Sequence, residues 1–135
     1  MKNFELKGIE LNVSRETAFA FIADAEKLPQ WTNAFASVTA GRAVMRTPDG
    51  EVSIDLAVEA SPGHGTVDWR MTFADGSVAT AFSRVVEIDR DRCVFGIVLT
   101  PPPLALEQIE GTLESQSQAL EKELRKLKKS LESHG

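Results

Sequence analysis

Apolar and polar residues alternate at the start of the chain, in "NFELKGIELNV", residues 3–13. The apolar positions before Gly8 and those after it have opposite parity. An extra residue in a strand reverses the alternation of side chains. The pattern therefore predicts a β-strand with a bulge at Gly8.

A helix is predicted next, over residues 15–25. Ser14 is a good N-cap, and apolar residues lie on more than one side of this segment, which is typical of a helix packed between two layers. Pro29 disfavours the helical conformation of the residue before it, so it is expected to end the helix. Trp31 follows two residues later, among polar neighbours.

The period of the pattern then changes to two residues. The turn sequences "TPDG", "SPGHG", "DG" and "DRDR" separate the apolar runs, and "PPP" ends the last one. Strands are predicted over residues 37–47, 51–60, 66–74, 77–88 and 93–100. Such short strands at regular spacing are typical of an antiparallel meander.

From Leu104 onward the helical period returns. The apolar residues that step by three, four and seven are Leu106, Ile109, Leu113, Leu120, Leu124, Leu127 and Leu131. They predict a C-terminal helix of about 28 residues, with Gly111 as a place for a bend. An antiparallel sheet needs cover for its apolar face, and this helix supplies it. The expected fold class is α+β, in a single domain spanning residues 1–135.

One face of the predicted sheet is apolar, and alternation assigns residues to it. On this basis the inner face is expected to carry Val52, Ile54, Leu56 and Val58; Val67, Trp69, Met71 and Phe73; Val78, Thr80, Phe82, Arg84, Val86 and Ile88; and Cys93, Phe95, Ile97 and Leu99. Periodicity does not say whether a cavity remains between this face and the helix.

The bulk composition narrows the function classes. The net charge of −5 argues weakly against nucleic acid as a partner. No apolar run is long enough to cross a membrane, and the N-terminal residues lack the apolar core of a signal peptide. With a single cysteine, Cys93, no internal disulfide forms, so a cytoplasmic protein is expected.

The order of elements and certain residues resemble the START-like superfamily, also called the Bet v 1-like or SRPBCC group, and within it the polyketide cyclase/dehydrase-like branch. The resemblance rests on "ELNVSRETAFAFIADAEKLPQW", with its Leu-Pro-x-Trp ending, on the strands that end at "TPPP", and on the long final helix. It implies a helix-grip fold, in which a curved antiparallel sheet wraps around the C-terminal helix. The chain is short between Trp31 and "TPDG", which leaves six to seven strands.

The resemblance also implies an apolar cavity between sheet and helix that holds a lipid, a polyketide, a quinone or a similar hydrophobic or aromatic ligand. The candidate ligand-binding residues are Trp31, Ile54, Leu56, Trp69, Met71, Phe73, Phe82, Arg84, Phe95, Ile97, Ile109 and Leu113. For each apolar residue among them, plain core packing is at least an equal interpretation. Trp31 is interpreted as an anchor between the short helices and the open end of the sheet.

Few residues offer chemistry. Arg84 could orient a carboxylate or carbonyl of a ligand, or it could point outward. His64 suits a general base at a cavity mouth, but an exposed turn residue is the simpler interpretation. Acidic residues early in the last helix, Glu107, Glu110 and Glu114, complement the helix dipole, and a catalytic acid or base among them is the lesser alternative. The sequence contains no metal-ligand constellation and no nucleotide-binding motif, so no metal or cofactor is expected, and no catalytic residue is assigned.

Two alternatives to a binding protein stay open. One is a cyclase- or dehydratase-like enzyme on the same fold. The other is a protein-interaction module that uses the basic segment 121–132, which holds five Lys or Arg and three Glu. If the final helix extends beyond the sheet, its leucines need cover, and a homodimer through this helix would supply it.

Overall fold

The structure, a computed structural model, describes residues 3–134. In chain order its elements are β1 (Glu5–Leu11), α1 (Arg15–Ala23), a 3-10 turn (Ala25–Lys27), α2 (Leu28–Trp31), β2 (Phe35–Thr39), β3 (Arg42–Thr47), β4 (Gly50–Ser61), β5 (Thr66–Thr72), β6 (Val78–Asp89), β7 (Arg92–Leu99), α3 (Leu104–Glu110) and α4 (Leu113–His134). No helix among these residues is long and apolar enough to cross a membrane.

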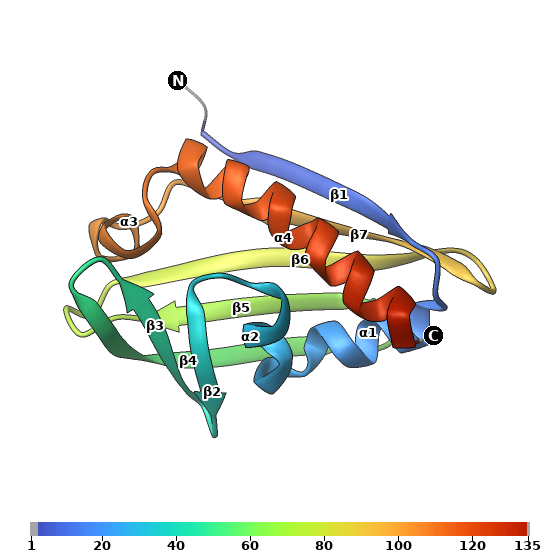
Figure 1. Cartoon of the computed structure of the whole chain (residues 1–135), viewed down its shortest axis with the longest axis horizontal. Coiled ribbons are helices and arrows are strands. Elements are labelled where there is room, and N and C mark those ends of the chain that lie inside the picture. Colours follow the sequence, from blue (N-terminus) through green and yellow to red (C-terminus); the bar gives the residue numbers. More distant parts are fainter. Residues whose placement is uncertain (1–2, 135) are drawn as a thin grey trace.

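The seven strands form one antiparallel sheet in the order β1-β7-β6-β5-β4-β3-β2. Figure 1 shows α4 running across one face of this sheet, with α1 and α2 beside its C-terminal half. The predicted α+β helix-grip architecture is thus confirmed, with seven strands.

The strand predicted over residues 37–47 is wrong, because the structure has two strands there. β2 and β3 form a hairpin that turns at Ala40 and Gly41, where φ is 50° and 81°. Two positive φ values are the mark of the turn that best matches the twist of a hairpin. Alanine rarely adopts positive φ, so the sequence does not signal this turn.

The first helix ends earlier than predicted, and not at Pro29. Asp24 leaves the helical conformation, with φ −81° and ψ 103°, and its side chain accepts a hydrogen bond from the backbone N–H of Glu26. Pro29 lies in the first turn of α2, where a missing N–H costs nothing. The N-cap at Ser14 is confirmed, because its hydroxyl accepts from the N–H of Thr17.

The predicted bulge at Gly8 is also wrong. β1 pairs with β7 in an unbroken register in which Gly8 lies opposite Gly96. Without an extra residue the alternation never reverses, so the earlier apolar residues stay outward. Phe4 and Leu6 are 60% and 62% exposed, whereas Leu11 is fully buried.

Gly111 breaks the C-terminal helix instead of bending it. Its φ of 85° and ψ of −170° lie in a region that is essentially restricted to glycine. The segment therefore forms two helices, α3 and α4. The break ends α3 at Glu110.

The leucines of α4 are covered within the chain. Leu120, Leu124, Leu127 and Leu131 are buried, and α4 packs mainly on β1 and α2. The condition for the predicted homodimer, leucines left uncovered by the sheet, is therefore not met, and the leucines supply no argument for a homodimer.

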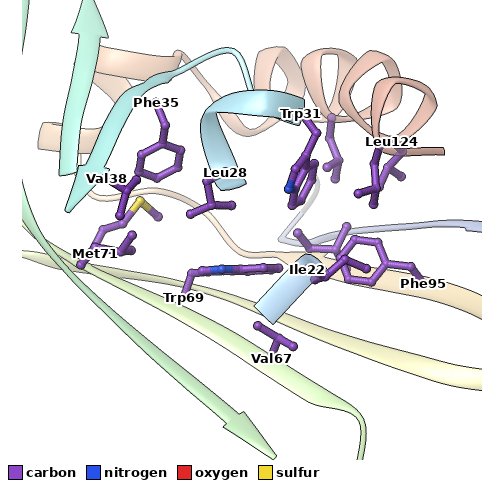
Figure 2. Close-up of a cluster of buried hydrophobic side chains, with 14 of the residues drawn as sticks. Ile22, Leu28, Trp31, Phe35, Val38, Val67, Trp69, Met71, Phe95 and Leu124 are labelled. Atoms are coloured by element: carbon purple, nitrogen blue, oxygen red, sulfur yellow. The ribbon is translucent and has the colours of Figure 1, made fainter. Parts of the chain in front are cut away.

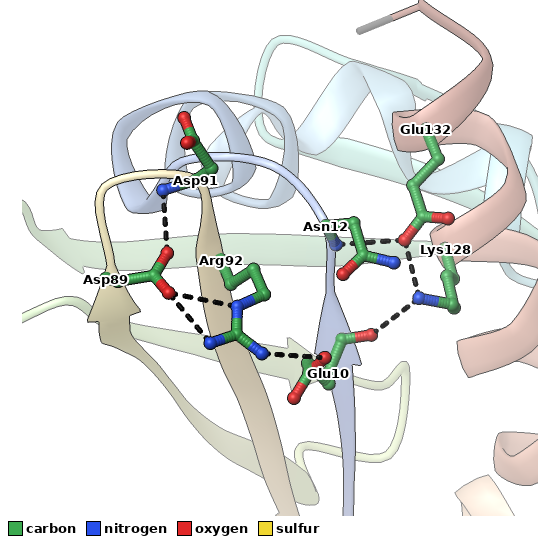
Figure 3. A network of polar contacts seen from close by, with 7 residues as sticks. All are labelled: Glu10, Asn12, Asp89, Asp91, Arg92, Lys128 and Glu132. Atoms are coloured by element: carbon green, nitrogen blue, oxygen red, sulfur yellow. Dashed lines mark hydrogen bonds and ion pairs between the residues drawn. The ribbon is translucent and has the colours of Figure 1, made fainter.

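Polar contacts hold the end of α4 to the end of β1 (Figure 3). The Lys128 ammonium donates to the backbone carbonyl of Glu10 at 3.0 Å and to the Glu132 carboxylate. Glu132 in turn accepts from the backbone N–H of Asn12 at 2.9 Å. These contacts join the C-terminal turns of α4 to the end of β1.

Candidate ligand-binding cavity

The inner face of β6 is the reverse of the predicted one. Ala79 pairs with Met71 and Ala81 with Trp69, so these alanines share the inner face with the larger side chains. Phe82 is 46% exposed, and Arg84 lies beside it on the outer face, where its Nε donates to the backbone carbonyl of His64. The predicted inward positions of Phe82 and Arg84 are thus wrong.

Small residues opposite bulky ones leave room under the helices. A cavity of about 140 Å³ lies between the sheet, α2 and the α3–α4 corner. Its walls include Leu28 and Phe35, and Leu120 of α4 lies above them. The cavity opens to solvent at Thr100 and Pro101, which are exposed residues of its lining.

Three aromatic rings form the inner end of this region (Figure 2). Trp31 meets Trp69 edge to face with ring centroids 6.2 Å apart, and both meet Phe95 in the same way, at 6.1 and 6.4 Å. Edge-to-face contacts stabilise each pair by about 1 kcal/mol beyond the area that they bury. Trp31 and Trp69 line the cavity, whereas Phe95 lies behind them.

Both indole N–H groups lack a hydrogen-bond partner. Trp31 and Trp69 are 2% and 4% exposed, and their Nε1 atoms are the buried side-chain polar atoms without a partner in the described part of the chain. Figure 2 shows both nitrogens on the side of their rings away from Phe95, toward Leu28 and Met71, which line the cavity. A buried donor without a partner costs about 1–3 kcal/mol.

Two carboxyl groups line the same cavity. Glu110 ends α3, and Glu123 lies one helical turn after Leu120 on α4. Burial, reinforced by the nearby charge of Glu123, raises the pKa of Glu110 to about 7. In the described part of the chain, no protein group donates a hydrogen bond to the Glu110 carboxyl.

Glu123 is the member of the pair that holds its charge more readily. Burial raises its pKa as well, but the backbone N–H of Asn33, at 2.7 Å, and the nearby Lys126 ammonium oppose that rise. Of the two carboxyl groups, Glu110 is therefore the one whose pKa burial raises into the neutral range.

The predicted ligand residues separate into four groups. Trp31, Trp69, Met71 and Ile97 line the cavity. Ile54, Phe73 and Ile109 line a different and more open groove of about 660 Å³, between the β3–β4 turn, the end of β5 and α3. Leu56 and Phe95 are buried and Leu113 is half-buried, and none of these three lines either hollow. Phe82 and Arg84 lie on the outer face.

His64 lies in the exposed turn before β5, and its Nδ1 is 2.9 Å from the Ser61 hydroxyl. It does not line the cavity. The exposed-turn interpretation describes its position.

The sequence interpretation favours the helix dipole for Glu110, with a catalytic role as the lesser alternative, and it does not single out Glu123. A signal for Glu123 existed, since it lies three residues after Leu120 and four before Leu127, on the face of the leucines. Glu110 has the same spacing, four residues after Leu106 and three before Leu113, but the break at Gly111 separates it from Leu113.

Comparisons with solved structures agree with this architecture. A START superfamily protein from Mycobacterium smegmatis matches 99% of this chain and 100% of its own, with a TM-score of 0.70 and 14% identity. A Deinococcus radiodurans protein matches 98% of this chain and 99% of its own, at a TM-score of 0.71 and 18% identity.

The chain has the START-like fold. The Zhui aromatase/cyclase from Streptomyces sp. R1128 shares this START-like fold, with 96% of this chain and 93% of that one covered, a TM-score of 0.64 and 10% identity. No family model matches the chain, and no curated protein matches it. At these identities the likeness establishes the fold alone.

Proposed function

We propose that this chain binds a small apolar ligand containing one ring in the cavity beneath α4. The observation that carries the proposal is the unfilled space of about 140 Å³ between Trp31, Trp69 and Leu120. An apolar cavity of about 150 Å³ holds benzene. One ring therefore fits, and a longer ligand of the quinone, polyketide or lipid class would extend through the opening at residues 100–103.

The mixed lining supports ligand binding over simple imperfect packing. Protein interiors leave few voids larger than a water molecule, and ligand sites combine apolar walls with a few convergent polar groups. This cavity has that composition, with two indole N–H groups and two carboxyl groups among apolar side chains.

Thermal shift with a panel of aromatic ketones, quinones, naphthols and fatty acids tests this function. A ligand that binds the folded state stabilises it by about 2.7 kcal/mol at a concentration one hundred times its Kd. Ala81→Leu should abolish the shift, because the larger side chain fills the cavity. Phe82→Leu, the neighbouring residue on the outer face, should preserve it. A panel without any shift would reject the function.

A second candidate function is a cyclase- or dehydratase-like enzyme, and the Glu110–Glu123 pair is the observation that favours it. A carboxyl that titrates near neutral pH suits general acid–base catalysis. Arg84 and His64 have no part in this mechanism, since neither lines the cavity. With a substrate that turns over, Glu110→Gln should lower kcat by at least a hundredfold, the usual contribution of such a group. Unchanged turnover would remove this candidate.

A further inference from the structure

Two hydrogen-bond donors in the cavity lining are buried without a partner. Trp31 Nε1–H and Trp69 Nε1–H have no partner in the described chain. Two other polar side chains in the lining are already satisfied, because Thr32 Oγ1 donates to the Leu28 carbonyl at 2.8 Å and Gln116 Nε2 to the Gly111 carbonyl at 3.0 Å. The buried donors without a partner are thus the two indoles, joined by Glu110 whenever that carboxyl is protonated.

We propose that the ligand presents a carbonyl oxygen to this donor set, formed by Trp31 Nε1–H, Trp69 Nε1–H and the carboxyl of Glu110. The inference rests on the proposed function and names the chemical class of its ligand. A carbonyl oxygen has two lone pairs and no proton, so it satisfies donors without needing an acceptor. Its ring lies against the apolar walls around Leu28 and Met71.

Charge in the cavity argues against the competing classes. A carboxylate ligand would place a second carboxyl group beside Glu123, whose charged form Asn33 N–H and Lys126 favour although burial opposes it. An ammonium ligand would be attracted by Glu123 but would leave both indole donors without an acceptor. A hydrocarbon would fill the space and leave the same donors unpaired, at the cost of their lost hydration.

A set of ligands of matched size separates these classes: acetophenone, 1-phenylethanol, 1-phenylethylamine, benzoate and isopropylbenzene. The chain has two tryptophans, so a ¹H–¹⁵N spectrum contains two indole signals, and both report on this site. Acetophenone should move both indole protons downfield relative to isopropylbenzene, whose ring alone perturbs them. Its affinity should exceed that of isopropylbenzene at least fivefold, the size of about one net hydrogen bond.

Two variants test the individual donors. Trp69→Phe and Trp31→Phe should each weaken acetophenone about fivefold while changing isopropylbenzene less, because only the ketone uses the lost N–H. Glu110→Gln replaces the carboxyl by an amide donor that does not titrate, so it is the variant for the pH test.

The same ligand provides a pH test. Glu110 and Glu123 are the titratable residues of the cavity lining, with Lys126 acting on Glu123. Acetophenone affinity should fall as the pH rises through about 7, where Glu110 loses its proton. Glu110→Gln should remove this dependence.

The outcomes separate the two proposals. Equal affinities for acetophenone and isopropylbenzene, or unmoved indole signals, would overturn the carbonyl assignment and leave the ligand-binding function standing. Tighter binding of the amine, the alcohol or benzoate than of the ketone would overturn it as well. No binding by any member of the set, together with no shift in the broad panel, would overturn both.

Discussion

Trp31 and Trp69 meet edge to face, with ring centroids 6.2 Å apart, although neither indole N–H has a partner in the described chain. Trp69 stabilises the fold through its ring area, whereas its N–H, buried without a partner, opposes folding. Trp69→Ala should cost about 3–5 kcal/mol of unfolding free energy, as for other buried large aromatics. Trp69→Phe should cost less than half of that, measured by urea denaturation. Equal costs would mean that the indole N–H has an acceptor in the folded protein.

The carboxyl of Glu110 makes stability depend on pH. Its pKa is about 7 in the folded chain and about 4.5 in the unfolded chain, so the folded state binds the proton more tightly. The resulting loss of unfolding free energy is absent below pH 4.5 and grows as the pH rises toward 7. Above pH 7 it has its full value. It should reach on the order of 2 kcal/mol, allowing for partial solvent exposure.

Urea denaturation from pH 5 to 8.5 measures this dependence. Relative to the wild type, Glu110→Gln should gain stability as the pH rises through this window. Glu107→Gln changes an exposed residue of the same helix and should keep the wild-type profile. Parallel curves for Glu110→Gln and the wild type would contradict the assignment of the proton to Glu110.

The break between α3 and α4 depends on Gly111. A Cβ at this position would lie 2.9 Å from Cβ of Ser115, and the backbone has φ 85°. Gly111→Ala should therefore cost about 1–3 kcal/mol of unfolding free energy. Gly63→Ala is the matched control, since φ there is not positive and nothing lies within 4 Å. Gly63→Ala should leave the unfolding free energy unchanged or raise it by up to about 1 kcal/mol. Equal effects of the two variants would contradict this account.

The leucine face of α4 is covered by the chain's own sheet. Leu127 is fully buried, so Leu127→Ala should cost about 2–5 kcal/mol of unfolding free energy. Lys126→Ala, at an exposed neighbouring position, should change it by less than about 0.5 kcal/mol. The wild-type midpoint should not depend on protein concentration, because cover within one chain involves no association. A midpoint that rises with concentration would instead indicate that a second copy covers this face.

The sequence pattern was enough for the succession of strand, helix, antiparallel strands and helical C-terminal segment, and for the inner faces of β5 and β7. Strict alternation placed Trp69, Met71 and Ile97 inward, and the step of three and four placed the leucines of the last helix on one stripe. These features are local, because the geometry of one strand or one helix sets which residues share a face.

Only the tertiary structure decides which residues line the cavity where a local pattern is compatible with two orientations. Both faces of β6 carry apolar residues, so only its register with β5 decides that Ala81, and not Phe82, lies beside Trp69. The helical pattern alone does not show that Glu110 lines a cavity. Its position there depends on the break at Gly111, which separates α3 from α4. A cavity is space that several elements leave between them, and its volume depends on how distant side chains pack rather than on the period of any one segment.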